Sequence, residues 1–421
     1  MEALSMVGSG GVYSWPAALL VAAIVVSASV RWWGIKRQPT TTESKARLPR
    51  GSLGWPVVGE TLAFISAAYS AQPESFVDKR RLLYGKVFKS HLWGSKAVVS
   101  SDAEVSRAVL QADASAFVPW YPSSLMQLMG ESSILVLGGG LQRRVHGLAG
   151  AFFKSPQLKA RLTVDMQRRV ADAMDAWQCH GVVRVQDEAK SIVFEILVKA
   201  LIGLEPGQEM HYLKQQFREF IAGLISLPIK LPGTQLYRSI QEENMELKKR
   251  KSAVGGTLEW TDYMSLAFTQ HVITETLRIG NIINGIMRKA VKDVEVKGQL
   301  LIPQGWCVFL YFRSVHLDGH IYDDPYAFNP WRWKERDMMA ASSGFTPFGG
   351  GQRLCPGVDL ARLEASIFLH HLVTTFRWEA EDDTVVTFPT VRLKRGMPIR
   401  VSQNIETSGT ATFRSTESAS V

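Results

Sequence analysis

The chain has 421 residues, 46% of them hydrophobic, and a formal charge of +9 at pH 7. That length gives room for one large buried core or two ordinary domains. The three cysteines, Cys179, Cys307 and Cys355, are too few and too scattered for a disulfide framework, which favours a reducing cytosolic compartment. The positive charge is spread along the chain and suits an anionic membrane surface or an acidic protein partner. We expect no nucleic-acid partner, because no zinc-ligand spacing, basic heptad helix or RNA-binding aromatic motif accompanies the charge.

An uncharged apolar run near the N-terminus, WPAALLVAAIVVSASV, covers Trp15–Val30 and is followed by Trp32 and Trp33. A bilayer-spanning helix needs about 20 apolar residues, so this short run is workable with its aromatic flanks. Positive residues follow the run, beginning with Arg31 and Lys36, which predicts that the rest of the chain stays cytosolic. We therefore predict a single-pass membrane anchor over residues 1–33. A cleaved secretory signal is the alternative, but it requires positive charge before the apolar run.

Residues 34–60 contain a stretch rich in Pro and Gly, LPRGSLGWPVVGE, from Leu48 to Glu60. Pro limits the backbone and Gly permits turns, so the stretch can be a plain linker. A hinge that sets a catalytic body against the bilayer has the same composition. The residues alone do not separate the two.

The body, residues 61–401, alternates helical and extended patterns. Helical patterns are predicted over Ser75–Tyr84, Leu158–Trp177, Asp187–Leu201, Trp260–Arg278 and Gly357–Phe376. Extended patterns predict a hairpin over Gly85–Ser100 and short strands over Asp293–Ile302 and Trp306–Phe312, whereas Phe117–Met129 is irregular. Residues 402–421 are rich in Ser and Thr and are predicted to be disordered. The fold class is therefore mainly α with a small β portion.

The segment Phe348–Gly357, FGGGQRLCPG, carries the clearest chemical signal. A lone cysteine is usually a small buried hydrophobe. Here three glycines up to Gly351 let the backbone approach a flat ligand, and Arg353 offers a fixed charge for a carboxylate. Cys355 stands just before an apolar helix, whose N-terminal N–H groups and dipole stabilise a thiolate. The pattern F-x-x-G-x-R-x-C-x-G indicates a thiolate ligand for haem iron.

Two further motifs precede this loop. Glu275 and Arg278 are three residues apart on one helix, a pairing that also decorates many surface helices. Arg332 belongs to an aromatic turn, Phe328-Asn-Pro-Trp-Arg-Trp333, which could equally be ordinary loop packing.

In this order, the three motifs resemble the cytochrome P-450 family. The resemblance implies the cytochrome P-450 fold behind the transmembrane anchor, a haem cofactor with Cys355 on the iron, and a buried triad of Glu275, Arg278 and Arg332. It also implies cofactor-binding roles for a set of residues around the haem: Phe348, Gly351, Arg353, Gly357, Arg288, Arg143 and His146. The segment QRRVH, Gln142–His146, replaces the family's usual Trp or His followed by Arg. A solvated helix face is the alternative for Arg143 and Arg144.

One element of the family is missing from the sequence. Members carry a long helix with A/G-G-x-D/E-T-T/S on the oxygen side of the haem, and the nearest imitation here, Val254–Glu259, is followed by Trp260. It lies sixteen residues before Glu275, which leaves no room for a helix of about 30 residues. We therefore predict an internal deletion near Gln241/Glu242. A central helix that buries roughly 1,000 Å² contributes about 25 kcal/mol, so its loss would be severe.

Several stretches, among them WTDYMSLAFTQHVITETLR and FNPWRW, resemble the plant brassinosteroid-biosynthetic branch, most closely its steroid C-23 hydroxylases. This implies steroid monooxygenation in the endoplasmic reticulum membrane, with electrons from NADPH through NADPH–cytochrome P-450 reductase. An apolar steroid pocket is expected from Phe117, Trp120, Tyr121, Leu125, Met129, Ile282, Ile283 and Ile286, each of which could equally be a core residue. The deletion leaves a second hypothesis open, a truncated product that is inert or only binds haem.

Overall fold

The computed structural model describes residues 46–403, with gaps at 57, 123–125, 127–131, 178–180, 222–234, 254–255, 335–343 and 388–390. The predicted anchor, residues 1–33, lies outside the described residues. Within them, no helix combines the length and the apolar character that crossing a bilayer requires.

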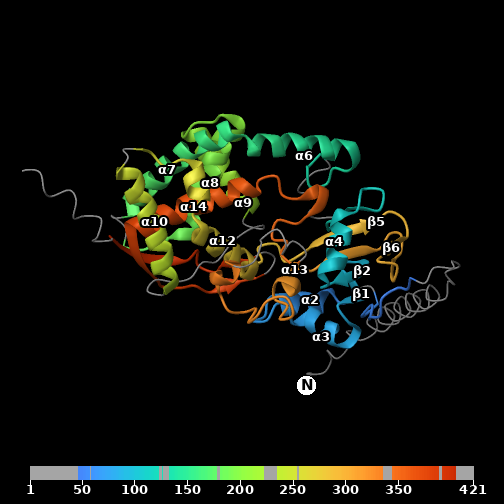
Figure 1. Ribbon diagram of the computed structural model, residues 1–421. Helices are drawn as coiled ribbons and strands as arrows, with labels where there is room; N and C mark the ends of the chain where they lie inside the picture. The colour runs from blue at the N-terminus through green and yellow to red at the C-terminus, as the bar shows by residue number, and fades with distance from the viewer. Residues whose placement is uncertain are drawn as a thin grey trace, which may run out of the picture.

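Helices make up most of the described chain (Figure 1). The α-helices are α2 (Thr61–Ala68), α3 (Ser75–Tyr84), α4 (Ala103–Gln111), α6 (Gly139–Lys154), α7 (Pro156–Trp177), α8 (Val185–Ile202), α9 (Gln208–Ile221), α10 (Gln235–Ala253), α11 (Trp260–Met264), α12 (Ala267–Gly280), α13 (Phe312–His316) and α14 (Val358–Thr375). Two short 3₁₀ helices, η1 (Pro330–Trp333) and η3 (Gly351–Arg353), lie in the motif loops. The mainly helical class with a small β portion is confirmed.

The largest sheet has five strands in the order β1-β2-β8-β5-β3. Its strands are β1 (Val87–Leu92), β2 (Ser95–Ser100), β3 (Phe117–Pro119), β5 (Ile286–Ala290) and β8 (Cys307–Leu310). The small sheets pair β4 (Val183–Arg184), β12 (Pro398–Gln403) and β9 (Phe376–Ala380), then β6 (Val294–Val296) with β7 (Leu300–Ile302), and β10 (Val385–Val386) with β11 (Arg392–Leu393). The hairpin predicted over Gly85–Ser100 is confirmed as β1 and β2.

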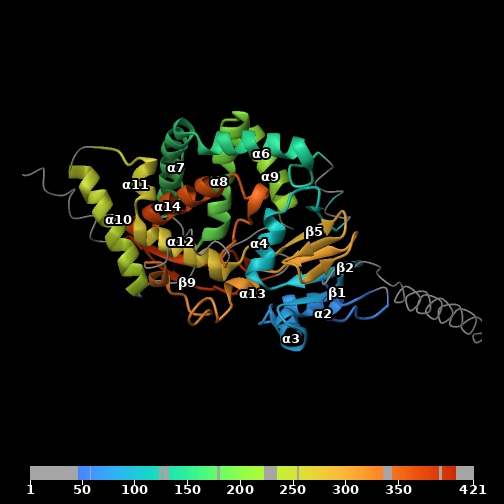
Figure 2. The same cartoon turned by 45° about the vertical axis from the view of Figure 1, so that its right-hand side comes forward.

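The core has a sheet part and a helical part, which lie at different ends of the molecule (Figure 2). In the sheet part, side chains alternate along β2: Ala97 and Val99 pack under α2 and α3, while Val98 faces α4. In the helical part, α14 supplies Leu360, Leu363 and Ile367 to a cluster with α7, α8 and α10. The predicted helices over Ser75–Tyr84, Leu158–Trp177, Asp187–Leu201 and Gly357–Phe376 are confirmed as α3, α7, α8 and α14.

The single helix predicted over Trp260–Arg278 is wrong, because the chain forms α11 and α12 with a break between them. Ser265 Oγ donates to the Asp262 carbonyl oxygen at 2.7 Å, a local bond that competes with helix continuation. Leu266 then leaves the helical conformation, with ψ of 85°, and becomes buried in the helical part of the core. Burial of one side chain at the turn thus overrides the helical spacing on either side.

Two other boundaries differ from the prediction. The strand predicted over Trp306–Phe312 ends at Leu310, and Phe312 begins α13. The first two residues of the predicted disordered tail, Ser402 and Gln403, are ordered instead, because they pair with β9 as the end of β12. Residues 404–421 lie outside the described residues.

The Pro- and Gly-rich stretch is fixed to the sheet part of the core. Bridges join Arg47 to Leu300 and Gly51 to Lys89, and the Lys89 N–H donates to the Arg50 carbonyl oxygen at 2.9 Å. Gly51 has a φ of +149°, and a Cβ there would overlap the Lys89 backbone. A freely flexible linker does not fit these contacts, which are those of an ordered extended segment.

Candidate functional site: the cysteine loop and its arginines

The loop from Phe348 to Gly357 is closed by one backbone hydrogen bond, from the Cys355 N–H to the Phe348 carbonyl oxygen at 3.1 Å. Cys355 is half-buried, and α14 begins three residues after it, at Val358. Phe348 packs beside Ile273 and Leu369, which fixes the loop between α12 and α14. The cysteine is therefore held at the entrance of α14, the position that the motif predicts.

The loop can approach α4 closely only because of glycine. Gly351 has a φ of +64°, and a Cβ on it would overlap the carbonyl oxygen of Leu110 at the end of α4. Gly349 also has a positive φ, +76°, but an added Cβ there would meet open space. The two glycines therefore do different things, since Gly351 permits a close contact and Gly349 only permits a turn.

Helix α6 touches the loop through two side chains on one face. Gln142 Nε2 donates to the Gln352 carbonyl oxygen at 3.3 Å, and His146 Nε2 donates to the Leu354 carbonyl oxygen at 2.7 Å. Gln142, the position that departs from the family pattern, is the buried residue of α6. Arg143 and Arg144 are exposed, and no contact among the described residues joins them to the loop. The structure thus brings His146 to the loop but not Arg143.

Arg288 and Arg353 come close together from β5 and η3. Burial lowers the pKa of both guanidinium groups, and the charge of Arg353 lowers the pKa of Arg288 further. Arg288 Nη1 donates to the Met287 carbonyl oxygen at 3.1 Å, and Arg353 donates to the carbonyl oxygens of Leu135 and Leu137. In the described part of the chain neither arginine has a carboxylate partner. A buried cation, Arg288, and a half-buried one, Arg353, without a carboxylate partner among the described residues fit the two propionates of haem.

Tyr121 belongs to this arginine pair. The pairing of β3 with β5 places Pro119 opposite Arg288, and the phenol of Tyr121 acts on the pKa of both arginines. The resemblance to steroid hydroxylases predicts Tyr121 as a substrate contact. Its position beside the cations could not be found from the sequence, because it depends on the register between two distant strands.

Glu275 is the centre of a buried polar cluster. Arg278 binds both of its carboxylate oxygens, at 2.9 and 2.8 Å, and Arg332 Nε donates to Oε1 at 3.1 Å. Trp333 Nε1 donates to Oε2 at 2.8 Å, and the Asn329 N–H donates to Oε1 at 2.9 Å. The structure brings the three predicted triad residues together and adds Trp333 and Asn329, which follow from the aromatic turn that η1 forms.

The charges of this cluster compensate each other in the interior. Glu275 and Arg278 are fully buried. Burial by itself would raise the pKa of Glu275, but the hydrogen bonds and the charge of Arg278 outweigh it and hold the pKa below its ordinary value. Arg278 also donates to the carbonyl oxygens of His316 and Pro325, so it ties α12 to the loop before η1. The cluster therefore positions that loop around α12.

The expected substrate residues fall in different surroundings. Phe117 is buried against the sheet with Ile286, as the core alternative has it, and Trp120 packs on the α2–α3 side of the sheet. Ile282 packs in the same cluster as Phe348, next to the cysteine loop, whereas Ile283 is exposed. Leu125 and Met129 lie outside the described residues. Tyr121 lies beside the two arginines, and Ile282 lies in the cluster that contains Phe348.

Sequence reasoning missed Glu364, a titratable residue on α14. Glu364 follows Cys355 by nine residues, and burial raises its pKa to about 8. Its Oε1 has no hydrogen-bond partner within the described ranges, nor has Nε2 of His371 two turns further along α14. An acidic residue inside a strongly apolar helix was the signal that could have found it.

Helix α10 runs without a break through Gln241 and Glu242, where the deletion is predicted. Asn244, three residues beyond Gln241, is fully buried. It donates to Thr269 Oγ1 at 3.0 Å, and His370 Nδ1 binds its Oδ1 at 2.9 Å. The residues after the predicted junction are therefore connected to both α12 and α14.

Comparison with known proteins agrees with this geometry. The family model described as "Cytochrome P450" matches residues 234–398. "Cytochrome P450 90D2" of Brachypodium distachyon is 82% identical over 510 aligned positions, covering 100% of both chains. Those 510 positions exceed the 421 residues of this chain by 89, so an identity of 82% means that nearly every residue of the chain is identical.

Two relatives from Arabidopsis thaliana bear the name "3-epi-6-deoxocathasterone 23-monooxygenase". CYP90D1 is 48% identical, over 86% of this chain and 91% of its own length, and CYP90C1 is 46% identical, over 86% and 85%. Among solved structures, the "Retinoic acid bound cyanobacterial CYP120A1" matches with a TM-score of 0.67, at 20% identity, over 85% of this chain and 100% of that chain. This last likeness concerns the fold alone.

Proposed function

Because this chain belongs to the cytochrome P450 family, we propose that it is a haem-dependent monooxygenase that hydroxylates a brassinosteroid precursor at side-chain carbon C-23. The observation that carries the proposal is the cysteine loop, closed on Phe348 and placed beside Arg288 and Arg353. The names of the relatives supply the substrate class and favour this function over an inert product.

In this proposal the thiolate of Cys355 binds the haem iron, and Arg288 and Arg353 bind the haem carboxylates. Gly351 keeps the loop against α4, and Gln142 and His146 hold it by its carbonyl oxygens. When bound, haem supplies the dioxygen chemistry that places one oxygen atom in a C–H bond while the other leaves as water. The cluster around Glu275 has a positioning role, because it is buried and touches neither the loop nor the arginine pair.

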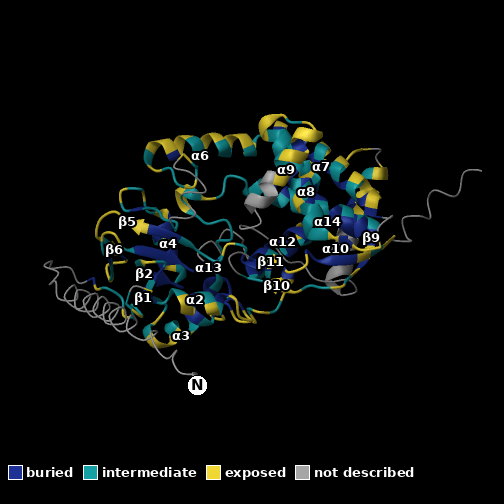
Figure 3. Cartoon of the chain, turned by 180° about the vertical axis from the view of Figure 1, so that it is seen from behind, coloured by how far each residue is buried: buried dark blue, intermediate teal, exposed yellow. Residues whose placement is uncertain are grey.

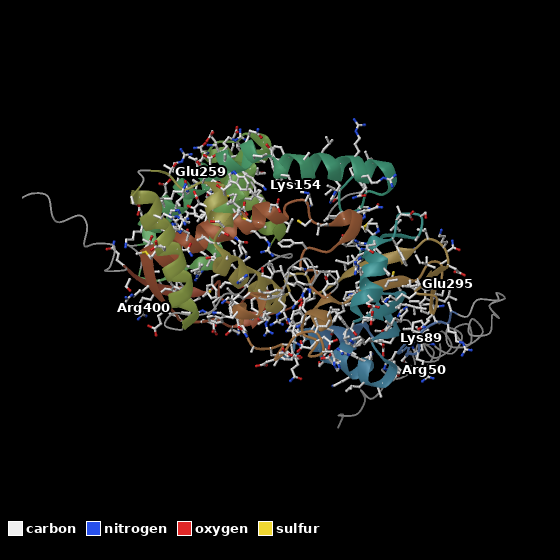
Figure 4. The ribbon with its side chains drawn as sticks, viewed as in Figure 1. Arg50, Lys89, Lys154, Glu259, Glu295 and Arg400 are labelled. Carbon is white, nitrogen blue, oxygen red and sulfur yellow. The ribbon has the colours of Figure 1, made fainter. Side chains whose placement is uncertain are left out.

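We propose NADPH–cytochrome P-450 reductase as the electron source. Arg143 and Arg144 are exposed on α6, the helix that contacts the cysteine loop, and Lys154 ends the same helix (Figure 4). A basic surface beside the loop suits an acidic partner. The chain is placed in the endoplasmic reticulum membrane by residues 1–33, with its body in the cytosol.

We further propose that the chain lacks the segment which covers the oxygen side of the haem, and that the segment is absent between Gln241 and Glu242. The 89 extra positions in the alignment with the Brachypodium relative support this. Glu364 supports it too, because its Oε1 has no hydrogen-bond partner among the described residues, whereas buried carboxyl groups ordinarily have one.

The test compares the chain with a version carrying the relative's segment at that junction, each with Cys355 intact and as Cys355→Ser. With reductase and NADPH, the segment-bearing Cys355 protein should hydroxylate the steroid side chain, and its reduced CO complex should show the thiolate-type red-shifted band. The Cys355→Ser version should lose both. If the band persists in Cys355→Ser, Cys355 is not the ligand, whereas a normal band without steroid hydroxylation would leave haem binding intact and overturn the substrate.

A further inference from the structure

The peptide unit that precedes Cys355 is held at both of its ends. Its carbonyl oxygen, on Leu354, accepts a hydrogen bond from His146 Nε2 at 2.7 Å. Its N–H, on Cys355, donates to the Phe348 carbonyl oxygen at 3.1 Å. Because a peptide unit is planar, these two bonds fix the orientation of the whole plane. One of the two peptide planes that meet at the Cys355 Cα atom is therefore fixed, and the side chain of His146 supplies one of the bonds that fix it.

The contact with Leu354 also shows which ring nitrogen of His146 carries a proton. A carbonyl oxygen can only accept a hydrogen bond, so Nε2 is the donor. A neutral imidazole has one N–H, and here the backbone of the cysteine loop accepts it. The family resemblance predicts that His146 contacts a haem carboxylate, but a neutral ring in this tautomer has no second N–H to donate to an anion. For the neutral ring, the two roles therefore exclude each other.

Further hydrogen bonds hold the beginning of α6 against the cysteine loop. Gln142 lies one helical turn before His146 on the same face, and its Nε2 donates to the Gln352 carbonyl oxygen at 3.3 Å. In the opposite direction, Arg353 donates to the carbonyl oxygen of Leu137, just before α6. Bonds thus run both ways between the loop and the helix, which gives His146 a fixed position relative to the loop.

The same helix supplies a matched control. Viewed from behind, α6 shows exposed surface along its length (Figure 3), and Gln142 is its buried residue. Leu148 follows His146 by two residues and is 65% exposed. Residues two apart on a helix do not share a face, so Leu148 does not lie on the side of α6 that contacts the loop.

We propose that His146 is a positioning residue for Cys355, which holds the peptide plane before the cysteine through the Leu354 carbonyl oxygen and so directs the sulfur toward the haem iron. The inference rests on the proposed function, because the sulfur has an iron to reach only if haem binds at this loop. Without the bond from His146, the plane can rotate about the bonds that flank it, and the sulfur points away from the iron more often. Loss of His146 therefore lowers the share of bound haem that has the thiolate ligand, although the thiol itself remains.

The experiment loads the full chain with haemin and records the reduced CO spectrum per bound haem, so that the extent of uptake does not affect the result. His146→Ala should lower the ratio of haem with the thiolate-type red-shifted band to haem without it about fivefold, the effect of one hydrogen bond. His146→Phe keeps a ring but has no N–H, and it should lower the ratio equally. His146→Gln places an amide N–H near the former Nε2 and should restore the ratio. Leu148→Ala should leave it unchanged.

Three results would overturn the inference. The ratio could stay unchanged in both His146→Ala and His146→Phe, or it could fall in His146→Gln as far as in His146→Ala. The third result would show that His146 binds a haem carboxylate: His146→Ala would release haem faster to excess apomyoglobin, while the haem that stays bound would keep the full thiolate-type band.

Failure of the proposed function itself would look different. In that case the unmodified chain loaded with haemin would show no thiolate-type band, or Cys355→Ser would keep the band. A band that requires Cys355 but does not respond to His146 leaves the haem ligand in place and overturns only the positioning role.

Discussion

Helices α6 and α14 both contact the loop that carries Cys355, yet their surroundings differ. Helix α14 buries nine of its residues and packs on α7, α10, α11 and α12. Helix α6, almost as long, buries only Gln142 among its described residues, and Leu141, Leu148 and Phe152 remain exposed. Among the described residues, the α14 wall of the loop is therefore largely buried, whereas the α6 wall is largely exposed.

The largest effect should come from inserting, between Gln241 and Glu242, the segment that we propose is absent there. We expect haem uptake and steroid hydroxylation to increase, because a covered site excludes water from the reacting centre. Amide hydrogen exchange in α6 should slow by at least about tenfold as the helix gains neighbours, while exchange in α14 changes little. If the unmodified chain hydroxylates the same precursor at a comparable rate, another segment covers the iron and the proposed deletion is wrong.

Glu275→Ala should strongly destabilise the part of the molecule in which α12 packs on α14. It leaves Arg278 buried without its carboxylate, and the free energy of unfolding should fall by ~3–5 kcal/mol. The control is Arg400→Ala, because Arg400 pairs with Glu381 on the surface of β12 (Figure 4) and should cost less than ~1 kcal/mol. Urea unfolding measures the free energy of unfolding of both variants. Equal decreases would mean that the buried Glu275 cluster stabilises the fold no more than a surface ion pair does.

A matched pair of truncations tests the two helices directly. Ile367→Ala on α14 opens a cavity in the core and should cost ~2–5 kcal/mol. Leu148→Ala on α6 removes an exposed side chain and should stay within ~0.5 kcal/mol. In the segment-bearing chain the cost of Leu148→Ala should rise. A large cost for Leu148→Ala in the unmodified chain would show that α6 is already packed.

The smallest effect concerns Glu364 and depends on pH. Its folded pKa of about 8 lies above the ordinary 4.5, so the folded chain keeps a proton that the unfolded chain has released. Stability should therefore fall as the pH rises from 4.5 to about 8. Glu364→Gln should remove that loss and gain ~1–3 kcal/mol at the alkaline end, with little change below the lower pKa. Exposed Glu379→Gln is the control, and parallel pH profiles for both variants would contradict the assignment.

The comparison also shows which features can be predicted from sequence. The cysteine loop and the Glu275 cluster were predictable because their residues form short motifs whose chemistry is specific to the pattern. The contacts of Gln142 and His146 were not, because both bind backbone carbonyl oxygens, which leave no trace in side-chain identity. Gln142 even departs from the family pattern at a position that the structure buries.

Helix boundaries failed where tertiary packing decides them. Trp260–Arg278 has helical spacing throughout, but burial of Leu266 divides it. Phe117 is of the residue type expected in an apolar pocket. It lies in the sheet core instead, because the register of β3 against β5 turns it inward. Single-residue placement of this kind depends on partners that lie far away in the chain.

The proposed deletion boundary lies within α10, close to a residue that bonds this helix to its neighbours. On the proposed boundary, Asn244 stands three residues after Gln241, less than one helical turn of 3.6 residues. Asn244 is the residue through which α10 bonds to Thr269 and His370. A deletion that extended three residues further along the chain would have removed Asn244, and with it the hydrogen bonds that join α10 to α12 and α14. Whether the fold survives such a deletion thus depends on the exact residue at which the deleted segment ends, whatever the length of that segment.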